Sequence, residues 1–392
     1  MTKMKLAFWI VISIFFISCN KNKNTGFIDE ENVSVFNLER MPTIKDPFIE
    51  LDSFIDSVKY IELEVSPESL IQVVSNIFVC DKFIIIVNKK QGEVLFFDSF
   101  GKYSHKINKK GKGPDEYIDL SQAMVDTKSE EVLIYDHSNR RLSYYNFDGR
   151  FKRSIDNFSH GAIIRQIINK SDGGFVCYTF DLHKVEDNYY GIWEVDSTGN
   201  FVKYYREEQG EFPLSFPMNS YSLYHLPDNR IGFMDLINCN IGYIDDSLNV
   251  TQKFKFPGKT MLDYKGIRSI SDEDSYKIFD VLSHFEKGSC RVTTLGFEGN
   301  ILYVLYDKKQ QTFKSSSCIL NKFQNKPMLI GNSVPNNTTS VLTTVIPVDL
   351  ISMLYNHSDK DANDLVKDIV KDKSKDQILD MNPIIQIVYM KE

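Results

Sequence analysis

A strand–break–strand–turn unit recurs along this chain and limits its fold more than any other feature. Each copy has an apolar strand, a short polar break, a second apolar strand, and a turn that ends in Gly or Asn. These two residues best tolerate the positive φ of a hairpin turn. The turn residues are Gly101, Gly149, Gly199, Asn249 and Asn325, at steps of 48, 50, 50 and 76 residues. The strand pairs are Phe83–Val87 with Val94–Gly101, Val132–Asp136 with Leu142–Gly149, Gly174–Tyr178 with Gly191–Gly199, Arg230–Met234 with Ile241–Asn249, and Ile301–Leu305 with Cys318–Asn325.

A period near 50 residues built from antiparallel strands predicts an all-β protein, a β-propeller with one four-stranded sheet per blade. The 20 Tyr and 28 Phe residues fit half-buried strands. The strand pattern excludes a helical solenoid. The alternative is a large β-sandwich or a pair of β domains.

The ends of the chain supply the material that closes the ring, since an open ring would leave strand edges exposed. Val58–Glu64 alternates like a strand, and Ser340–Ile346 and Ile384–Tyr389 are strands without a unit of their own. We expect the N-terminal strand to pair with the C-terminal ones in one composite blade. With the five repeats this makes a six-bladed propeller.

Helical patterns occur at two places, so we expect two short helical insertions. Ser271 with Asp274 resembles a capping box, and Ile278, Leu282 and Phe285 follow at helical spacing, which explains the long 76-residue step. The second helix is expected over Asp361–Asp376, where four apolar residues share one face: Leu365, Val366, Ile369 and Val370.

The N-terminus has the pattern of an exported protein. Lys3 and Lys5 precede about a dozen apolar residues, too few for an ordinary membrane-spanning helix, which needs roughly 20. Ser18 and Cys19 follow, which resembles the lipobox of bacterial lipoprotein precursors, where the cysteine thiol is acylated, for example with palmitate. The alternatives are a signal peptide with an incidental cysteine, or an uncleaved anchor. We therefore expect a signal peptide over residues 1–18, a flexible lipid-anchored tether over 19–45, and the propeller over 46–392.

The segment Gly111–Tyr117 reads Gly-Lys-Gly-Pro-Asp-Glu-Tyr. With Tyr60–Glu64, Phe97–Lys102 and Asn382–Pro383, it resembles a family of bacterial six-bladed β-propeller lipoproteins of unknown function. The resemblance covers essentially the mature chain and is weakest over residues 200–340. It implies the fold and the lipid anchor, and it implies no reaction.

This glycine motif is the first candidate site. A phosphate-binding P-loop has a different glycine spacing and opens a helix, so we interpret the motif as a connection between blades. Gly111 and Gly113 are expected to supply unusual φ angles, and Pro114 to stiffen the loop. Glu116 and Tyr117 are expected to bond neighbouring backbone; the alternative is that they face a ligand.

The remaining reactive residues form no catalytic pattern. Linear spacing cannot exclude a central metal with ligands from several blades, but we predict no metal site, no cofactor and no catalytic residue. The polar loop 136–141 and the carboxylate pairs 207–208 and 245–246 are interpreted as turns or solvated loops. The seven histidines are scattered: His105, His137, His160, His183, His225, His284 and His357. Beyond Cys19 there are five cysteines whose pairing the sequence leaves open: Cys80, Cys177, Cys239, Cys290 and Cys318.

The sequence favours a binding protein of the cell envelope, anchored to a membrane by its N-terminal lipid. The formal charge of −7 argues against a nucleic-acid partner. We expect a monomer that binds a glycan or an envelope protein. The alternatives are a lyase or hydrolase acting on saccharides or lactones in the central channel, and a structural envelope component.

Overall fold

The computed structural model describes residues 27–30, 33–37, 50–179, 191–207, 221–226, 229–235, 240–255, 280–287, 290–297, 300–310, 312–316, 320–324, 326–329, 341–355, 360–371 and 373–391. Strands dominate these ranges, and their helices lie near the C-terminal end.

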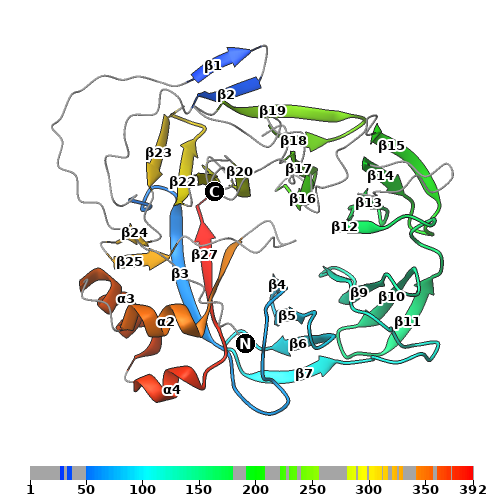
Figure 1. The fold of residues 1–392 in the computed structure, drawn as a ribbon, viewed down its shortest axis with the longest axis horizontal. Coiled ribbons are helices and arrows are strands. Elements are labelled where there is room, and N and C mark those ends of the chain that lie inside the picture. The colour runs from blue at the N-terminus through cyan, green and yellow to red at the C-terminus, as the bar shows by residue number, and fades with distance from the viewer. Residues whose placement is uncertain are drawn as a thin grey trace, which may run out of the picture.

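Six blades of antiparallel strands form a ring (Figure 1), which confirms the predicted six-bladed β-propeller. In the first five blades the strands pair in chain order, and the first strand faces the centre, as Figure 1 shows for β4, β12 and β16. Blades 1 to 3 consist of β4 (Asn76–Val79), β5 (Ile84–Asn88), β6 (Glu93–Phe97) and β7 (Tyr103–Ile107); β8 (Gln122–Asp126), β9 (Glu131–Asp136), β10 (Arg141–Asn146) and β11 (Phe151–Ile155); and β12 (Ile164–Asn169), β13 (Phe175–Thr179), β14 (Gly191–Val195) and β15 (Phe201–Glu207). Blades 4 and 5 consist of β16 (Tyr221–His225), β17 (Ile231–Asp235), β18 (Asn240–Ile244) and β19 (Leu248–Lys255); and β20 (Asp280–Lys287), β21 (Cys290–Phe297), β22 (Asn300–Asp307) and β23 (Thr312–Ser316).

The sixth blade is the composite one, and the predicted closure is confirmed. Strand β27 (Ile384–Met390) pairs with β26 (Val341–Ile346) on one side and with the N-terminal strand β3 (Ile55–Glu62) on the other. Strands β24 (Leu320–Phe323) and β25 (Lys326–Leu329) form a two-stranded sheet, which Gln386 of β27 joins by donating from Nε2 to the Leu329 carbonyl (2.7 Å). Both ends of the chain therefore hold the ring shut.

The turns between the third and fourth strands of blades 1 to 3 follow the predicted repeat. Gly101, Gly149 and Gly199 have φ of +83°, +81° and +88°. A Cβ on Gly101 would also lie 2.1 Å from the Glu62 carbonyl oxygen. The prediction for Asn249 is wrong, because this residue belongs to β19 and the preceding turn is made by residues 245–247.

The fifth repeat was assigned wrongly. The predicted first strand is β22, the third strand of blade 5, and its outer partner is β23 rather than the segment from Cys318. Strand β23 reads Thr-Phe-Lys-Ser-Ser and lacks an apolar run, whereas the apolar residues after Cys318 enter the separate β24–β25 sheet. The outer strand of a blade needs few apolar residues, so its sequence signal is weak.

The helices of the described chain lie between β26 and β27. They are α2 (Val348–Tyr355), α3 (Lys360–Val370) and α4 (Lys375–Leu379). The predicted helix over 361–376 is therefore confirmed as α3 up to Val370, and α4 begins after a break with Ser374 as its N-cap. The helix expected around Leu282 and Phe285 is wrong, because β20 pairs with β21 along its length; Ser271 lies outside the described residues.

Strands β1 (Phe27–Glu30) and β2 (Val33–Asn37) lie in the segment that was expected to be a flexible tether. Strand β2 pairs in parallel with β19, the outer strand of blade 4. This segment forms a strand because its Val-Ser-Val-Phe sequence alternates apolar and polar residues at the start, as strands do.

The hydrophobic core lies between neighbouring blades. One cluster joins blades 1 and 2 around Phe96, Tyr117 and Ile134, and similar clusters join the next pairs and the composite blade to blade 1. Burying such a side chain contributes about 1.5–3 kcal/mol. Packing against neighbouring blades thus stabilises the blades that these clusters join.

Polar side chains fix the register between blades. Gln122 of β8 donates from Nε2 to the Ile167 carbonyl (2.6 Å) and accepts the Ile167 N–H (2.8 Å). Gln166 of β12 does the same with Leu223 of β16 (2.7 and 2.8 Å). These glutamines act like an added peptide group between adjacent inner strands. The sequence analysis does not predict them, although each is a polar residue directly before an apolar pair in an inner strand.

Candidate functional site

A pocket of about 520 Å³ opens where four blades meet at one mouth of the ring. It is lined by the turns that follow the inner strands β4, β8, β12 and β16, together with the ends of those strands. We call it the channel-mouth pocket. Its volume lies within the usual range for small-ligand sites, roughly 300–1,000 Å³.

The turn after β8 shows how the chain shapes this pocket. Asp126 accepts the N–H groups of Lys128 (2.9 Å) and Ser129 (3.3 Å) at Oδ1. Glu130 then adopts φ +51°, a region that costs a non-glycine residue free energy. Its side chain lines the pocket, so glycine, the cheaper choice for this backbone, would remove a carboxylate from the lining.

Ion pairs at the pocket join residues of two blades in one case and of a single blade in another. Lys82 of blade 1 meets Glu130 of blade 2 at 2.6 Å, and this hydrogen bond raises the pKa of the Lys82 ammonium. In blade 3, Lys170 meets Glu194 at 2.5 Å and Asp172 at 2.9 Å. Burial opposes the charge on Lys170, but the bonds to both carboxylates raise its pKa overall.

His225 lies at the pocket wall of blade 4. Burial lowers its pKa to about 4, so the imidazole is neutral at pH 7. Its Nε2 donates to Oδ1 of Asn169 in blade 3 (3.3 Å). The charged lining residues are three lysines and three carboxylates, so the lining is balanced: Asp81, Lys82, Asp126, Lys128, Glu130 and Lys170.

The predicted glycine motif lies at the other end of β8. The Gly113 N–H donates to Oε2 of Glu116 (2.7 Å), and the Gly111 N–H donates to the Tyr117 carbonyl (2.9 Å). The buried Tyr117 hydroxyl donates to the Gly92 carbonyl (2.8 Å) in blade 1. None of these residues lines the channel-mouth pocket.

The expected reason for the glycines is wrong, because neither Gly111 nor Gly113 has positive φ. A Cβ on Gly111 would lie 2.0 Å from Oε2 of Glu116, so the folded-back carboxylate is what leaves no room for a side chain. Arg141 donates to the Pro114 carbonyl (3.0 Å), which ties the loop to the next blade.

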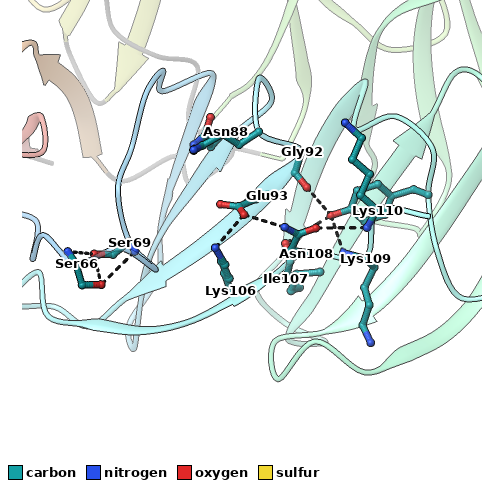
Figure 2. Close-up of polar contacts among 12 residues, drawn as sticks. Ser66, Ser69, Asn88, Gly92, Glu93, Lys106, Ile107, Asn108, Lys109 and Lys110 are labelled. Atoms are coloured by element: carbon teal, nitrogen blue, oxygen red, sulfur yellow. Dashed lines mark hydrogen bonds and ion pairs between the residues drawn. The ribbon is translucent and has the colours of Figure 1, made fainter.

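Beside the motif, a buried carboxylate joins two outer strands of blade 1 (Figure 2). Glu93 accepts from Lys106 Nζ (2.9 Å) and Asn108 Nδ2 (2.8 Å) at Oε1. This contact holds the start of the motif loop close to the turn at Gly92, whose carbonyl Figure 2 shows facing the loop.

The histidines and cysteines of the described residues lie apart. His160 bonds the Gly199 carbonyl (2.7 Å) and His284 bonds Thr293 Oγ1 (2.9 Å), in different blades. Within the described ranges, no group of three His, Cys, Asp or Glu side chains could hold a metal ion. His183 and His357 lie outside those ranges.

Cys80 and Cys177 are free thiols, and Cys290 is buried in blade 5. Burial raises the pKa of Cys80 to about 11 and that of Cys177 further. Cys19, Cys239 and Cys318 lie outside the described residues, so lipid attachment at Cys19 stays a prediction. In the part of the chain that is described, no helix is long and apolar enough to cross a bilayer.

The ring of six blades makes the protein a β-propeller, and comparison with known proteins gives its family. Residues 15–389 match the model of the domain of unknown function DUF4934, and the chain belongs to this family. A search of curated proteins found no match.

Two solved structures from Bacteroides resemble this one. A candidate exported protein of Bacteroides fragilis is 16% identical with a TM-score of 0.67, over 88% of this chain and 97% of that one. A member of the DUF4221 family from Bacteroides vulgatus is 9% identical with a TM-score of 0.49, over 87% and 99%. At this identity, the first likeness supports the fold.

Proposed function

We propose that this protein is an exported lipoprotein of the cell envelope that binds a polar, uncharged ligand in its channel-mouth pocket. The signal-like residues 1–18 and Cys19 support export and anchoring, and the likeness to a candidate exported protein supports export alone. Lipid on Cys19 would hold the propeller at a membrane, with the pocket open to the surrounding compartment.

The observation that carries the binding role is the composition of the pocket. Four separate blades bring amide, hydroxyl, ammonium and carboxylate groups to one cavity, and their formal charges cancel. Two pairs of these groups already bond to each other, Lys82 with Glu130 and His225 with Asn169, so part of the lining is positioned before a ligand arrives. Such a preorganised surface favours a ligand with many hydroxyl groups and no net charge, such as a neutral oligosaccharide.

The test is calorimetric titration of the full chain, purified in detergent, with neutral oligosaccharides of hexoses and N-acetylhexosamines. Lys128→Glu reverses a charge at the exposed pocket rim and should weaken binding more than tenfold, whereas Lys112→Glu, on the motif loop, should leave it unchanged. Equal binding by both variants, or no binding by the wild type, would refute the proposal.

A further inference from the structure

One hairpin turn of the propeller carries an aromatic residue that its fold does not require. The turns of blades 1 and 3 have the same geometry. Oδ1 of Asp98 accepts the N–H groups of Phe100 and Lys102, each at 2.9 Å. Oδ1 of Asp196 accepts those of Thr198 and Asn200, also at 2.9 Å.

The residue before the turn glycine is at the tip in each blade. It is Phe100 in blade 1, Asp148 in blade 2 and Thr198 in blade 3, and all three are exposed. Phe100 is 87% exposed. Since a polar residue serves the same turn in the other two blades, the turn itself does not account for an aromatic ring at this position.

The ring stands at a hollow of about 880 Å³ on the side of the disc. Strand β3, the turn with Phe100 and the end of α3 line it together. Burial, and then the charge of Asp368, raise the pKa of Tyr60 in this hollow, so its phenol stays protonated and can donate a hydrogen bond.

The carboxylates of the hollow have hydrogen-bond or ion-pair partners, whereas two of its lysines have no ion-pair partner among the described residues. Of its carboxylates, Glu62 pairs with Lys373 (2.7 Å), and Glu64 accepts the N–H of Tyr103 (2.8 Å). Lys102 and Lys371 have no ion-pair partner among the described residues. The hollow therefore offers cations to a ligand, although the whole chain carries −7.

We propose that this hollow is a second binding site, for a small ligand in which a ring carries a carboxylate. The ring lies on Phe100, and the carboxylate meets Lys102 and Lys371. Uronic acids and aromatic carboxylates share this chemistry. Strand β3, the turn tip and the end of α3 bound the hollow, and its volume of about 880 Å³ lies within the range of small-ligand sites, roughly 300–1,000 Å³.

The experiment separates the contribution of the ligand's ring to affinity from that of its carboxylate. The full chain in detergent is titrated, by ligand-observed NMR, with glucuronate and benzoate (ring and charge), glucose (ring alone) and acetate (charge alone). We expect glucuronate or benzoate to bind at least about tenfold more tightly than glucose and acetate, and the better of the two identifies the source. Equal affinity for all four probes overturns the proposal.

Variants locate the site. Phe100→Thr copies the tip residue of blade 3. It should weaken binding of the ring-bearing carboxylate about tenfold without unfolding the turn. Lys102→Gln should weaken binding of the same ligand severalfold. Lys112→Gln, on the motif loop and outside both cavities, is the matched control and should bind as the wild type does. Phe100 and Lys102 lie outside the channel-mouth pocket, so a failure of that pocket leaves this result unaffected. Unchanged binding by Phe100→Thr overturns the proposal, as does wild-type binding only to anionic phospholipid vesicles.

Discussion

Asn382 is the side chain whose removal should most clearly open the ring. It is fully buried, where the last strand leaves the helices. Its Oδ1 accepts the Ile71 N–H (2.9 Å), and its Nδ2 donates to the carbonyls of Glu64 (2.8 Å) and Ser69 (3.0 Å). It thus joins the C-terminal strand to the loop that enters blade 1.

Asn382→Ala should lower the free energy of unfolding by about 2–6 kcal/mol. The Glu64 carbonyl keeps the hydroxyl of Ser69 as a donor (2.8 Å), so two backbone groups lose their partner: the Ile71 N–H and the Ser69 carbonyl. Each buried polar group left without a partner costs about 1–3 kcal/mol. Urea unfolding followed by circular dichroism measures the change.

The matched control is Asn200→Ala. Asn200 is exposed, and its side chain bonds only within its own turn, to Asp196 (3.3 Å) and Thr198 (2.7 Å). The expected change is within about 0.5 kcal/mol. A loss below about 1 kcal/mol for Asn382→Ala, or equal losses for the two variants, would show that the ring does not depend on this joint.

Three other perturbations have definite expected results. Gly111→Ala should destabilise the protein by about 1–3 kcal/mol in thermal melts, because its Cβ meets the Glu116 carboxylate, and Glu116→Ala should relieve most of this loss in the double variant. Cys19→Ala should move the protein from the membrane to the soluble exported fraction or leave it as an uncleaved precursor; a membrane-bound, mature-sized product would contradict lipid anchoring. The pKa of His225 is lowered from 6.5 to about 4, so the unfolded chain takes up this proton first as the pH falls. Its contribution to stability is complete above about pH 6.5 and is lost between about pH 6.5 and 4, and His225→Gln should flatten unfolding free energies over that window.

The sequence predicts the blades wherever two adjacent strands are both buried. Strands β5 and β6 are buried at every residue, which explains their strong apolar signal. Outer strands such as β23 lack that signal, so blade 5 was placed wrongly. At Leu282 and Phe285 the spacing fits a helix, but pairing of β20 with β21 overrides a local pattern.

The candidate sites were much harder to predict. Lys82 and Glu130 meet at 2.6 Å only because two blades pack side by side, and neither has a neighbour in sequence that marks a binding residue. Phe100 could have been found by aligning the tips of the three turns, since it is the aromatic member among Asp and Thr. The glycine motif is the reverse case: its pattern is conspicuous, but its side chains bond to backbone groups within the loop and in blade 1.

The composite blade also determines when folding of the ring can be completed. Tyr60 of β3 pairs with Gln386 of β27, more than 300 residues later, so the first propeller strand to leave the ribosome waits for the last. The entropic cost of closing so long a loop rises by only about 0.6 kcal/mol per doubling of its length. The long separation therefore delays folding more than it lowers stability. Until synthesis ends, β3 is an unpaired edge that another chain can capture. A circular permutant with its ends between blades 2 and 3 would make β3 and β27 near neighbours in sequence, and it should assemble faster and aggregate less than the natural order.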